Sequence, residues 1–150
     1  MNFREEIRVR SKGSILIEGI AALFILSLMM MFSMNVYIHN NRVLKERILR
    51  ENLNRAIYNI TNELKYNTKM NELKDRLNED SLKLSFNEEF FSELISKEIL
   101  DLTQGDDIKI SKIKEDEYKL EILITGFVNK DNIKVDIEES FIKMWWMEYV

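Results

Sequence analysis

The feature that most constrains this chain is a long apolar run close to its N-terminus. Between residues 15 and 34, every residue is apolar except Glu18, Gly19, Ser27 and Ser33. Twenty helical residues span roughly 30 Å, which matches the hydrocarbon core of a bilayer. The core helix of a soluble protein would instead show a polar face at helical spacing, and this run has none. The run therefore predicts one transmembrane helix.

The flanks of the run distinguish a retained helix from a cleaved secretory signal. Four basic residues precede it, as in the n-region of a signal peptide: Arg4, Arg8, Arg10 and Lys12. However, the run exceeds the roughly 7–15 residues of a signal h-region, and no small-x-small cleavage site follows it. We therefore expect the helix to remain in the mature protein. Orientation does not follow from the positive-inside rule alone, because five basic residues also follow closely: Arg42, Lys45, Arg47, Arg50 and Arg55.

Glu18 is the unusual residue of this run. A charged side chain at the centre of a bilayer costs about 2.5–3.5 kcal/mol on insertion scales, and less near the end of the span. One interpretation is a carboxylate that reaches the headgroups or is protonated. The other is a carboxylate that meets a cationic partner inside the membrane.

The stretch KGSILIEGIAALFIL, which begins at Lys12, resembles the class III signal of type IV prepilins and pseudopilins. Such signals have a short basic leader that ends in glycine, followed by an apolar helix whose fifth residue is glutamate. Gly13 corresponds to the last leader residue, Ser14 to the new N-terminus and Glu18 to the fifth residue. The resemblance covers about residues 8–38. The serine start, the absence of proline from the helix and the absence of cysteine fit a minor pilin or pseudopilin better than a major pilin.

The resemblance implies a set of partners and processing steps. A prepilin peptidase would cut between Gly13 and Ser14 on the cytoplasmic side and methylate the new Ser14 amine. Glu18 would pair with the N-terminal amine of a neighbouring pilin or pseudopilin at the inner-membrane assembly platform. In a medium of low dielectric constant such a pair offsets a desolvation cost that neither charge offsets alone. The subunit would cross the membrane lipid once, with a cytoplasmic N-terminus and an extracytoplasmic head, and then join a surface filament of a type IV pilus, type II secretion or DNA-uptake system.

These features divide the chain into a leader (1–13), a transmembrane half-helix (14–38), an amphipathic half-helix (39–66) and a globular head (67–150). Apolar residues recur at helical spacing between Leu44 and Leu64, and no glycine or proline separates them from the apolar run. We therefore expect one helix from Ser14 to about Tyr66, with a break near residues 39–41 as the alternative. The expected fold class is α+β and pilin-like, with this helix packed on a small antiparallel sheet.

The first part of the head predicts short elements. Residues 67–81 are polar and indicate a connector with one or two helical turns through Met70, Leu73 and Leu77. The sequence LKLSF at 82–86 alternates in hydropathy like a short strand. Asn87 is expected to cap a helix, because its side chain can accept a hydrogen bond from a free backbone N–H. One face of this helix would carry Phe90, Phe91, Leu94, Ile95 and Ile99.

The last third of the chain predicts an antiparallel meander of about three strands. The segments that begin near Ile108, Tyr118 and Ile133 alternate in hydropathy, and the polar sequences KEDE and NKDN separate them. Connections this short join antiparallel neighbours. After Glu139 the apolar positions change phase, which predicts a bulge or a strand end.

The chain ends in MWWMEYV, which concentrates three aromatic residues at Trp145, Trp146 and Tyr149. One interpretation, which we favour, is that the last strand packs these rings onto the amphipathic half-helix. The alternative is an interface with another subunit, because aromatic residues concentrate at interface hot spots.

No pattern in the sequence indicates catalysis, a metal or a cofactor. The chain has no cysteine, a single histidine at position 39 and four scattered glycines, so thiolate, multi-histidine and phosphate-loop sites are not expected. Net charge is −4, and removal of the leader would make it −6, which disfavours direct nucleic-acid binding. We therefore expect an assembly subunit and not an enzyme. The alternative is a single-pass, membrane-anchored binding or scaffold module in which Glu18 is incidental.

Overall fold

The computed structural model describes residues 3–79 and 81–149, with the side chains of residues 15–78 and 81–147. The chain forms two compact units, one up to Val43 and the other from Leu44 onward. The first unit consists of the first part of helix α1 (Phe3–Asn62), and the second contains the rest of α1 and all other elements. Each unit is described by itself.

Helix α1 continues without a break through residues 39–41, so the expectation of a single helix is confirmed and the alternative of two helices is wrong. Asparagine is a weak helix former, but unlike proline it keeps its backbone N–H donor. The helix therefore continues across Asn40 and Asn41. After Asn62 the helix widens into a π-helical turn, η1 (Glu63–Asn67). The helical segment therefore ends close to the predicted position.

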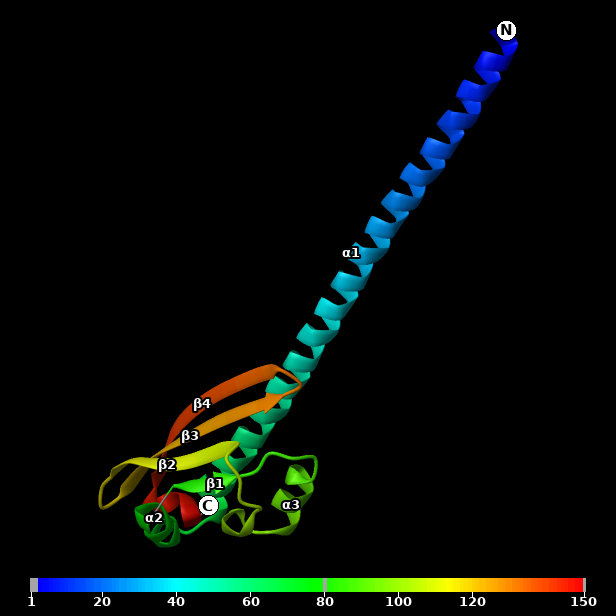
Figure 1. Cartoon of the computed structure of the whole chain (residues 1–150). Helices are drawn as coiled ribbons and strands as arrows, with labels where there is room; N and C mark the ends of the chain where they lie inside the picture. The colour runs from blue at the N-terminus through cyan, green and yellow to red at the C-terminus, as the bar shows by residue number, and fades with distance from the viewer. Residues whose placement is uncertain (1–2, 80, 150) are drawn as a thin grey trace. The chain divides into compact units, whose positions relative to one another are not determined.

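The head is an α+β unit built on a four-stranded antiparallel sheet in the order β1-β2-β3-β4 (Figure 1). Its strands are β1 (Leu82–Leu84), β2 (Ile108–Glu115), β3 (Lys119–Lys130) and β4 (Ile133–Met144). The predicted α+β class is confirmed, but the count of three strands was wrong. The fourth is β1, part of the LKLSF segment, whose three residues pair with the start of β2.

A two-residue turn joins β3 to β4 and confirms the prediction from NKDN. Lys130 lies opposite Ile133, and the turn residues Asp131 and Asn132 have φ values of 54° and 62°. Positive φ at both central residues is the type I′ geometry, which matches the twist of a hairpin, and Asn and Asp adopt it more readily than most residues.

The second part of α1 packs on one face of the sheet. The two elements approach closely at Gly126 of β3, where an added Cβ would lie 3.1 Å from methyl groups of Leu53 and Ile57. Alternate strand residues point into this core, as a period of two requires. The fully or nearly fully buried apolar residues on α1, β2, β3 and β4 are Leu53, Ala56, Ile57, Ile60, Ile108, Ile110, Leu120, Ile122, Ile124, Val128, Ile133, Val135 and Phe141.

The prediction of a bulge or a strand end after Glu139 was wrong, because β4 keeps a single register with β3 and continues to Met144. The inward positions of β4 are instead filled by polar residues where the apolar pattern stops. The side chain of Glu139 is half-buried and accepts a hydrogen bond from Thr61 Oγ1 at 3.5 Å. The irregularity of the sheet lies in β2, between Lys112 and Lys114.

Lys143, the next polar residue on the inner face of β4, is fully buried. Its Nζ donates hydrogen bonds to the carbonyl oxygens of Leu64 at 2.9 Å and Lys65 at 2.7 Å. The last carbonyls of a helix lack intrahelical donors and lie at the negative end of its dipole. A buried lysine from the sheet therefore caps the C-terminal end of the long helix.

The polar segment after η1 contains more helix than predicted. Helix α2 (Met70–Glu79) has ten residues, and the three apolar residues expected to organise it, Met70, Leu73 and Leu77, are buried. Lys74 anchors α2 to β2, because its Nζ lies 3.4 Å from a carboxylate oxygen of Glu115. Hydrogen bonding from Lys112, and then the nearby Lys74, lowers the pKa of Glu115.

Helix α3 (Phe90–Ser96) is shorter than the predicted helix and begins differently. Asn87 Oδ1 accepts the backbone N–H of Glu89 at 3.0 Å, so it forms a turn before the helix and does not cap the helix itself. Phe90 is buried, but Ile95 is 88% exposed, so its predicted place on the packed face was wrong. A short 3-10 turn, η2 (Ile99–Asp101), follows and buries Ile99.

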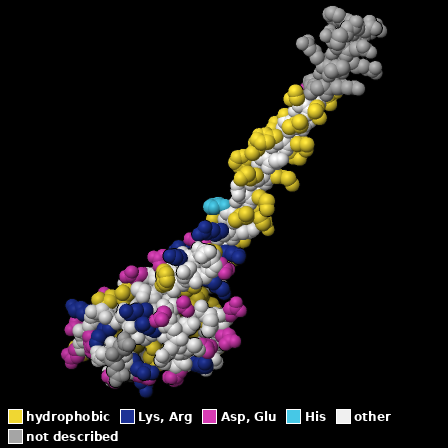
Figure 2. Space-filling view, in the orientation of Figure 1, with side chains coloured by type: hydrophobic (Ala, Val, Ile, Leu, Met, Phe, Trp, Pro, Cys, Tyr) yellow, Lys and Arg dark blue, Asp and Glu magenta, His cyan; other side chains and the backbone are white. Residues whose placement is uncertain are grey.

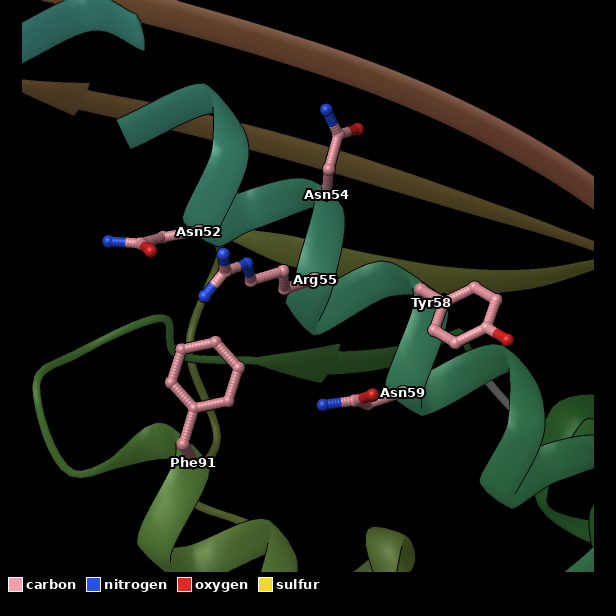
Figure 3. Close-up of a pocket in the computed structure, with 6 residues that line it drawn as sticks. All are labelled: Asn52, Asn54, Arg55, Tyr58, Asn59 and Phe91. Carbon is pink, nitrogen blue, oxygen red and sulfur yellow. The ribbon is translucent and has the colours of Figure 1, made fainter. Parts of the chain in front are cut away.

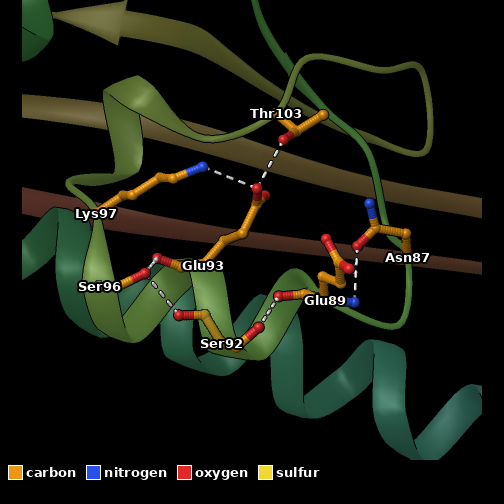
Figure 4. A network of polar contacts seen from close by, with 7 residues as sticks. All are labelled: Asn87, Glu89, Ser92, Glu93, Ser96, Lys97 and Thr103. Atoms are coloured by element: carbon orange, nitrogen blue, oxygen red, sulfur yellow. Dashed lines mark hydrogen bonds and ion pairs between the residues drawn. The ribbon is translucent and has the colours of Figure 1, made fainter.

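Glu93 ties α3 to the segment that follows it (Figure 4). One carboxylate oxygen accepts hydrogen bonds from Lys97 Nζ and Thr103 Oγ1, each at 2.9 Å. These two donors stabilise the charged form and hold the pKa of Glu93 below its ordinary value, with Lys97 the larger cause. Ser92 and Ser96 complete the network by donating to backbone carbonyls one turn earlier, at Glu89 and Ser92.

We expect Glu93→Gln to destabilise the head at neutral pH and to have less effect in acid. A lowered folded-state pKa stabilises the fold above the unfolded pKa, near 4.5, and this contribution disappears as pH falls through the folded value. Unfolding midpoints of both proteins at about pH 6 and about pH 3 test this linkage. Glu98→Gln, an exposed glutamate nearby, is the control. An equal loss at both pH values for Glu93→Gln would contradict the assignment.

Candidate functional site

The most distinctive surface of the first unit is its exposed apolar helix. Every described side chain from Ile15 to Val43 is exposed, including a continuous series of leucine, isoleucine, phenylalanine and methionine residues (Figure 2). A helix that forms the core of a soluble protein is mostly buried, whereas no part of this apolar window is buried in the chain itself. By length and composition, α1 can cross a membrane.

The two serines of the apolar segment are satisfied within the helix. Ser27 Oγ donates to the carbonyl oxygen of Leu23, and Ser33 Oγ donates to that of Met29, both at 2.8 Å. In hydrocarbon a hydroxyl without a partner costs several kcal/mol, so this local bonding is what lipid requires. Of the described side chains between residues 15 and 38, Glu18 is the one that carries a charge.

The residues predicted to serve in processing and docking lie along α1. Gly13 and Ser14 belong to the helix, and their side-chain positions lie outside the described part of the structure. Glu18 is exposed on the apolar stretch. The neighbouring Gly19 has open space around it, since a Cβ built there meets nothing within 4 Å outside the local helix backbone.

The end of the apolar stretch has the composition of a membrane interface. Tyr37 and His39 are exposed there, and basic side chains follow on the next turns, where Figure 2 shows lysine and arginine after the apolar region. Tyrosine favours the headgroup level of a bilayer, where its ring and hydroxyl meet different environments. His39 shows no feature that assigns it a separate role.

The aromatic C-terminus forms a short 3-10 turn, η3 (Trp145–Tyr149), which contacts η1. The contact with η1 agrees with the favoured packing onto the end of the amphipathic half-helix, but Trp145 is 53% exposed and Trp146 is 48% exposed, so these rings are only partly covered. The Trp145 backbone N–H donates to the carbonyl oxygen of Tyr118 at 3.1 Å, which places a third exposed aromatic residue beside the turn. The side chain of Tyr149 lies outside the described residues.

A pocket open to solvent lies between the second part of α1 and α3 (Figure 3). Its lining consists of three amides, one guanidinium and two aromatic rings: Asn52, Asn54, Arg55, Tyr58, Asn59 and Phe91. Figure 3 shows Asn52, Arg55 and Asn59 on the side of α1 that faces Phe91, whereas Asn54 and Tyr58 point away from it. Sequence reasoning missed this pocket, because its two sides come from segments more than thirty residues apart in the chain.

Among the residues that the structure describes, no group of three or more His, Asp or Glu side chains is arranged to hold a metal ion. Comparisons of the chain with protein-family models, with curated proteins and with solved structures find no match.

Proposed function

We propose that this chain is a minor pilin or pseudopilin subunit, which a prepilin peptidase processes and which enters a filament through its N-terminal helix. The observation that carries the proposal is the sequence Gly13-Ser14, followed by Glu18, at the start of an apolar helix that the rest of the chain leaves exposed. The α+β head, in which the same helix continues onto an antiparallel sheet, supports it.

The exposed helix explains why such a subunit needs two environments. Before assembly, lipid would surround the apolar side chains of α1 and keep them out of water. The backbone polar groups would stay hydrogen-bonded within the helix. After assembly, the same side chains would pack against helices of other subunits. Glu18 would favour the second state, because a nearby N-terminal amine supplies the opposite charge that lipid lacks.

The head offers a surface for contacts with other subunits. Trp145 and Trp146 are about half exposed beside Tyr118, and large aromatic rings of this kind are enriched at the centres of protein interfaces. Together with Tyr149, they are our candidate residues for an interface with another subunit. Type IV pili, type II secretion systems and DNA-uptake filaments all use subunits with this type of N-terminus, and the proposal extends to all three.

Processing at Gly13 is the first prediction of this proposal. In cells that possess a prepilin peptidase, the intact mass of the membrane-extracted protein should correspond to a chain that begins at Ser14, with one added methyl group. Gly13→Leu should block the cut. Gly19→Leu serves as a matched control, since the space around Gly19 is open and the residue lies beyond the cut.

A chain that keeps residues 1–13 in such cells would contradict the proposal. It would instead favour the alternative, a single-pass anchored binding or scaffold module in which Glu18 has no docking role. Cleavage of both glycine variants would show that processing does not depend on Gly13 and would also contradict the prediction.

A further inference from the structure

We propose that the pocket between α1 and α3 binds a neutral saccharide. This inference is independent of filament assembly, because it concerns only residues of the second unit, from Leu44 onward. It begins from the composition of the lining. On the side that faces Phe91, two carboxamides and one guanidinium present hydrogen-bonding groups, the Phe91 ring presents apolar surface, and no aliphatic side chain belongs to the lining.

The three polar groups that face Phe91 form a single row on α1. Asn52, Arg55 and Asn59 are spaced by three and four residues, so they lie on one side of the helix. Asn52 and Asn59 are separated by about 10 Å along the helix axis, which is close to the length of two linked sugar rings. A carboxamide both donates and accepts hydrogen bonds, as a sugar hydroxyl does, so each asparagine can engage two neighbouring hydroxyls.

Both amides are available for a ligand. Within the described part of the chain, no hydrogen bond engages the side chain of Asn52 or Asn59. The rigid helix holds both residues in place, so binding requires little ordering of the backbone.

Phe91 supplies the apolar side of the pocket and is itself held in position. Its ring makes edge-to-face contacts with Phe86, at 6.3 Å between centroids, and with Phe90, at 5.7 Å. Phe90 is buried, whereas Phe91 is only partly buried, so part of its ring is left for a ligand. The C–H face of a sugar ring is apolar and packs on an aromatic surface that water otherwise covers.

The charge of the lining argues for a neutral ligand. Arg55 is the one charged lining residue, and its guanidinium pairs with Glu51 on the preceding turn at 2.5 Å. An anionic ligand would compete with this carboxylate. A peptide ligand is disfavoured because its side chains would find Phe91 but no aliphatic pocket to enter.

The test is a titration of the full chain in phosphocholine micelles, which carry no sugar headgroup. The probes are maltotriose, cellotriose and chitotriose, with trialanine as the peptide probe, and saturation-transfer NMR and calorimetry report binding. We expect at least one trisaccharide to bind saturably. The double variant Asn52→Ala/Asn59→Ala should weaken that binding by about tenfold or more. Both positions lie on the helix surface, so the variant should fold.

Matched controls come from outside the pocket. Asn71→Ala removes an exposed amide of α2, and Phe127→Leu removes an exposed phenylalanine of β3, so each should change affinity by less than about twofold. Phe91→Leu should weaken binding, whereas Phe127→Leu should not. The proposal is overturned if no trisaccharide binds saturably, if the double asparagine variant binds as well as the parent, or if trialanine binds with the same dependence on these residues.

Discussion

Replacement of Lys143 by methionine is expected to lower the free energy of unfolding of the head by about 2–4 kcal/mol. The substitution keeps most of the volume of the side chain but removes the ammonium that donates to the carbonyl oxygens of Leu64 and Lys65. These carbonyls end the long helix, and Lys143 is fully buried against them, so water does not easily replace it. Against a typical total stability of about 5–15 kcal/mol, this is a large loss.

The measurement is guanidinium unfolding of the full chain in micelles, followed by the fluorescence of the two tryptophans that immediately follow β4. Lys134→Met is the matched control, because Lys134 is an exposed lysine on the same strand. It should change stability by less than about 0.5 kcal/mol. Equal stability of Lys143→Met and the parent would show that the ammonium does not stabilise the end of the helix.

Glu18→Ala is expected to leave membrane insertion and cleavage intact while it lowers incorporation into filaments by about tenfold or more. The variant removes the one charged side chain of the described apolar segment, so entry into lipid becomes no more costly. Assembly loses the pairing of carboxylate and amine, and a tenfold change corresponds to about 1.4 kcal/mol. This prediction rests on the proposed function.

Quantitative mass spectrometry of membrane and sheared-filament fractions separates the two steps. Ser33→Ala is the control, because it removes a polar group from the same apolar segment whose hydroxyl already bonds within the helix. Normal incorporation of Glu18→Ala would show that the carboxylate is not the docking element. Failure of the variant to reach the membrane would contradict the expectation that insertion stays intact.

The parts of the fold that were predicted correctly depend on local patterns. The apolar run, the continuous helix and the turn at Asp131 and Asn132 follow from residues that are neighbours in the chain. Strand β1 was expected as a short strand, but its place in the sheet was missed, because its pairing with Ile108–Ile110 joins distant segments. Ile95 had the right spacing for the packed face, but α3 ends one residue later and leaves it exposed.

The candidate sites divide in the same way. Gly13, Ser14 and Glu18 were selected from a linear motif, which the sequence alone displays. Their proposed roles in cleavage and docking stay predictions. The pocket could not be predicted from the sequence, in which Asn52 and Asn59 indicate only the polar face of an amphipathic helix. Phe91 of α3 lies beside them only in the folded chain. The large aromatic rings of Trp145 and Trp146 suggested packing onto the helix. Their position just after β4 leaves both rings about half exposed.

The sequence by itself determined that one apolar helix of membrane length carries a single carboxylate near its start, because hydropathy and helical rise are properties of consecutive residues. Only the tertiary structure decided where the polar residues of the head find partners. Lys143 lies inside the core because the end of a helix 78 residues earlier in the chain presents the carbonyl oxygens of Leu64 and Lys65 to its ammonium. A hydrogen bond between distant segments offsets the cost of burying an ammonium, and no local pattern encodes it.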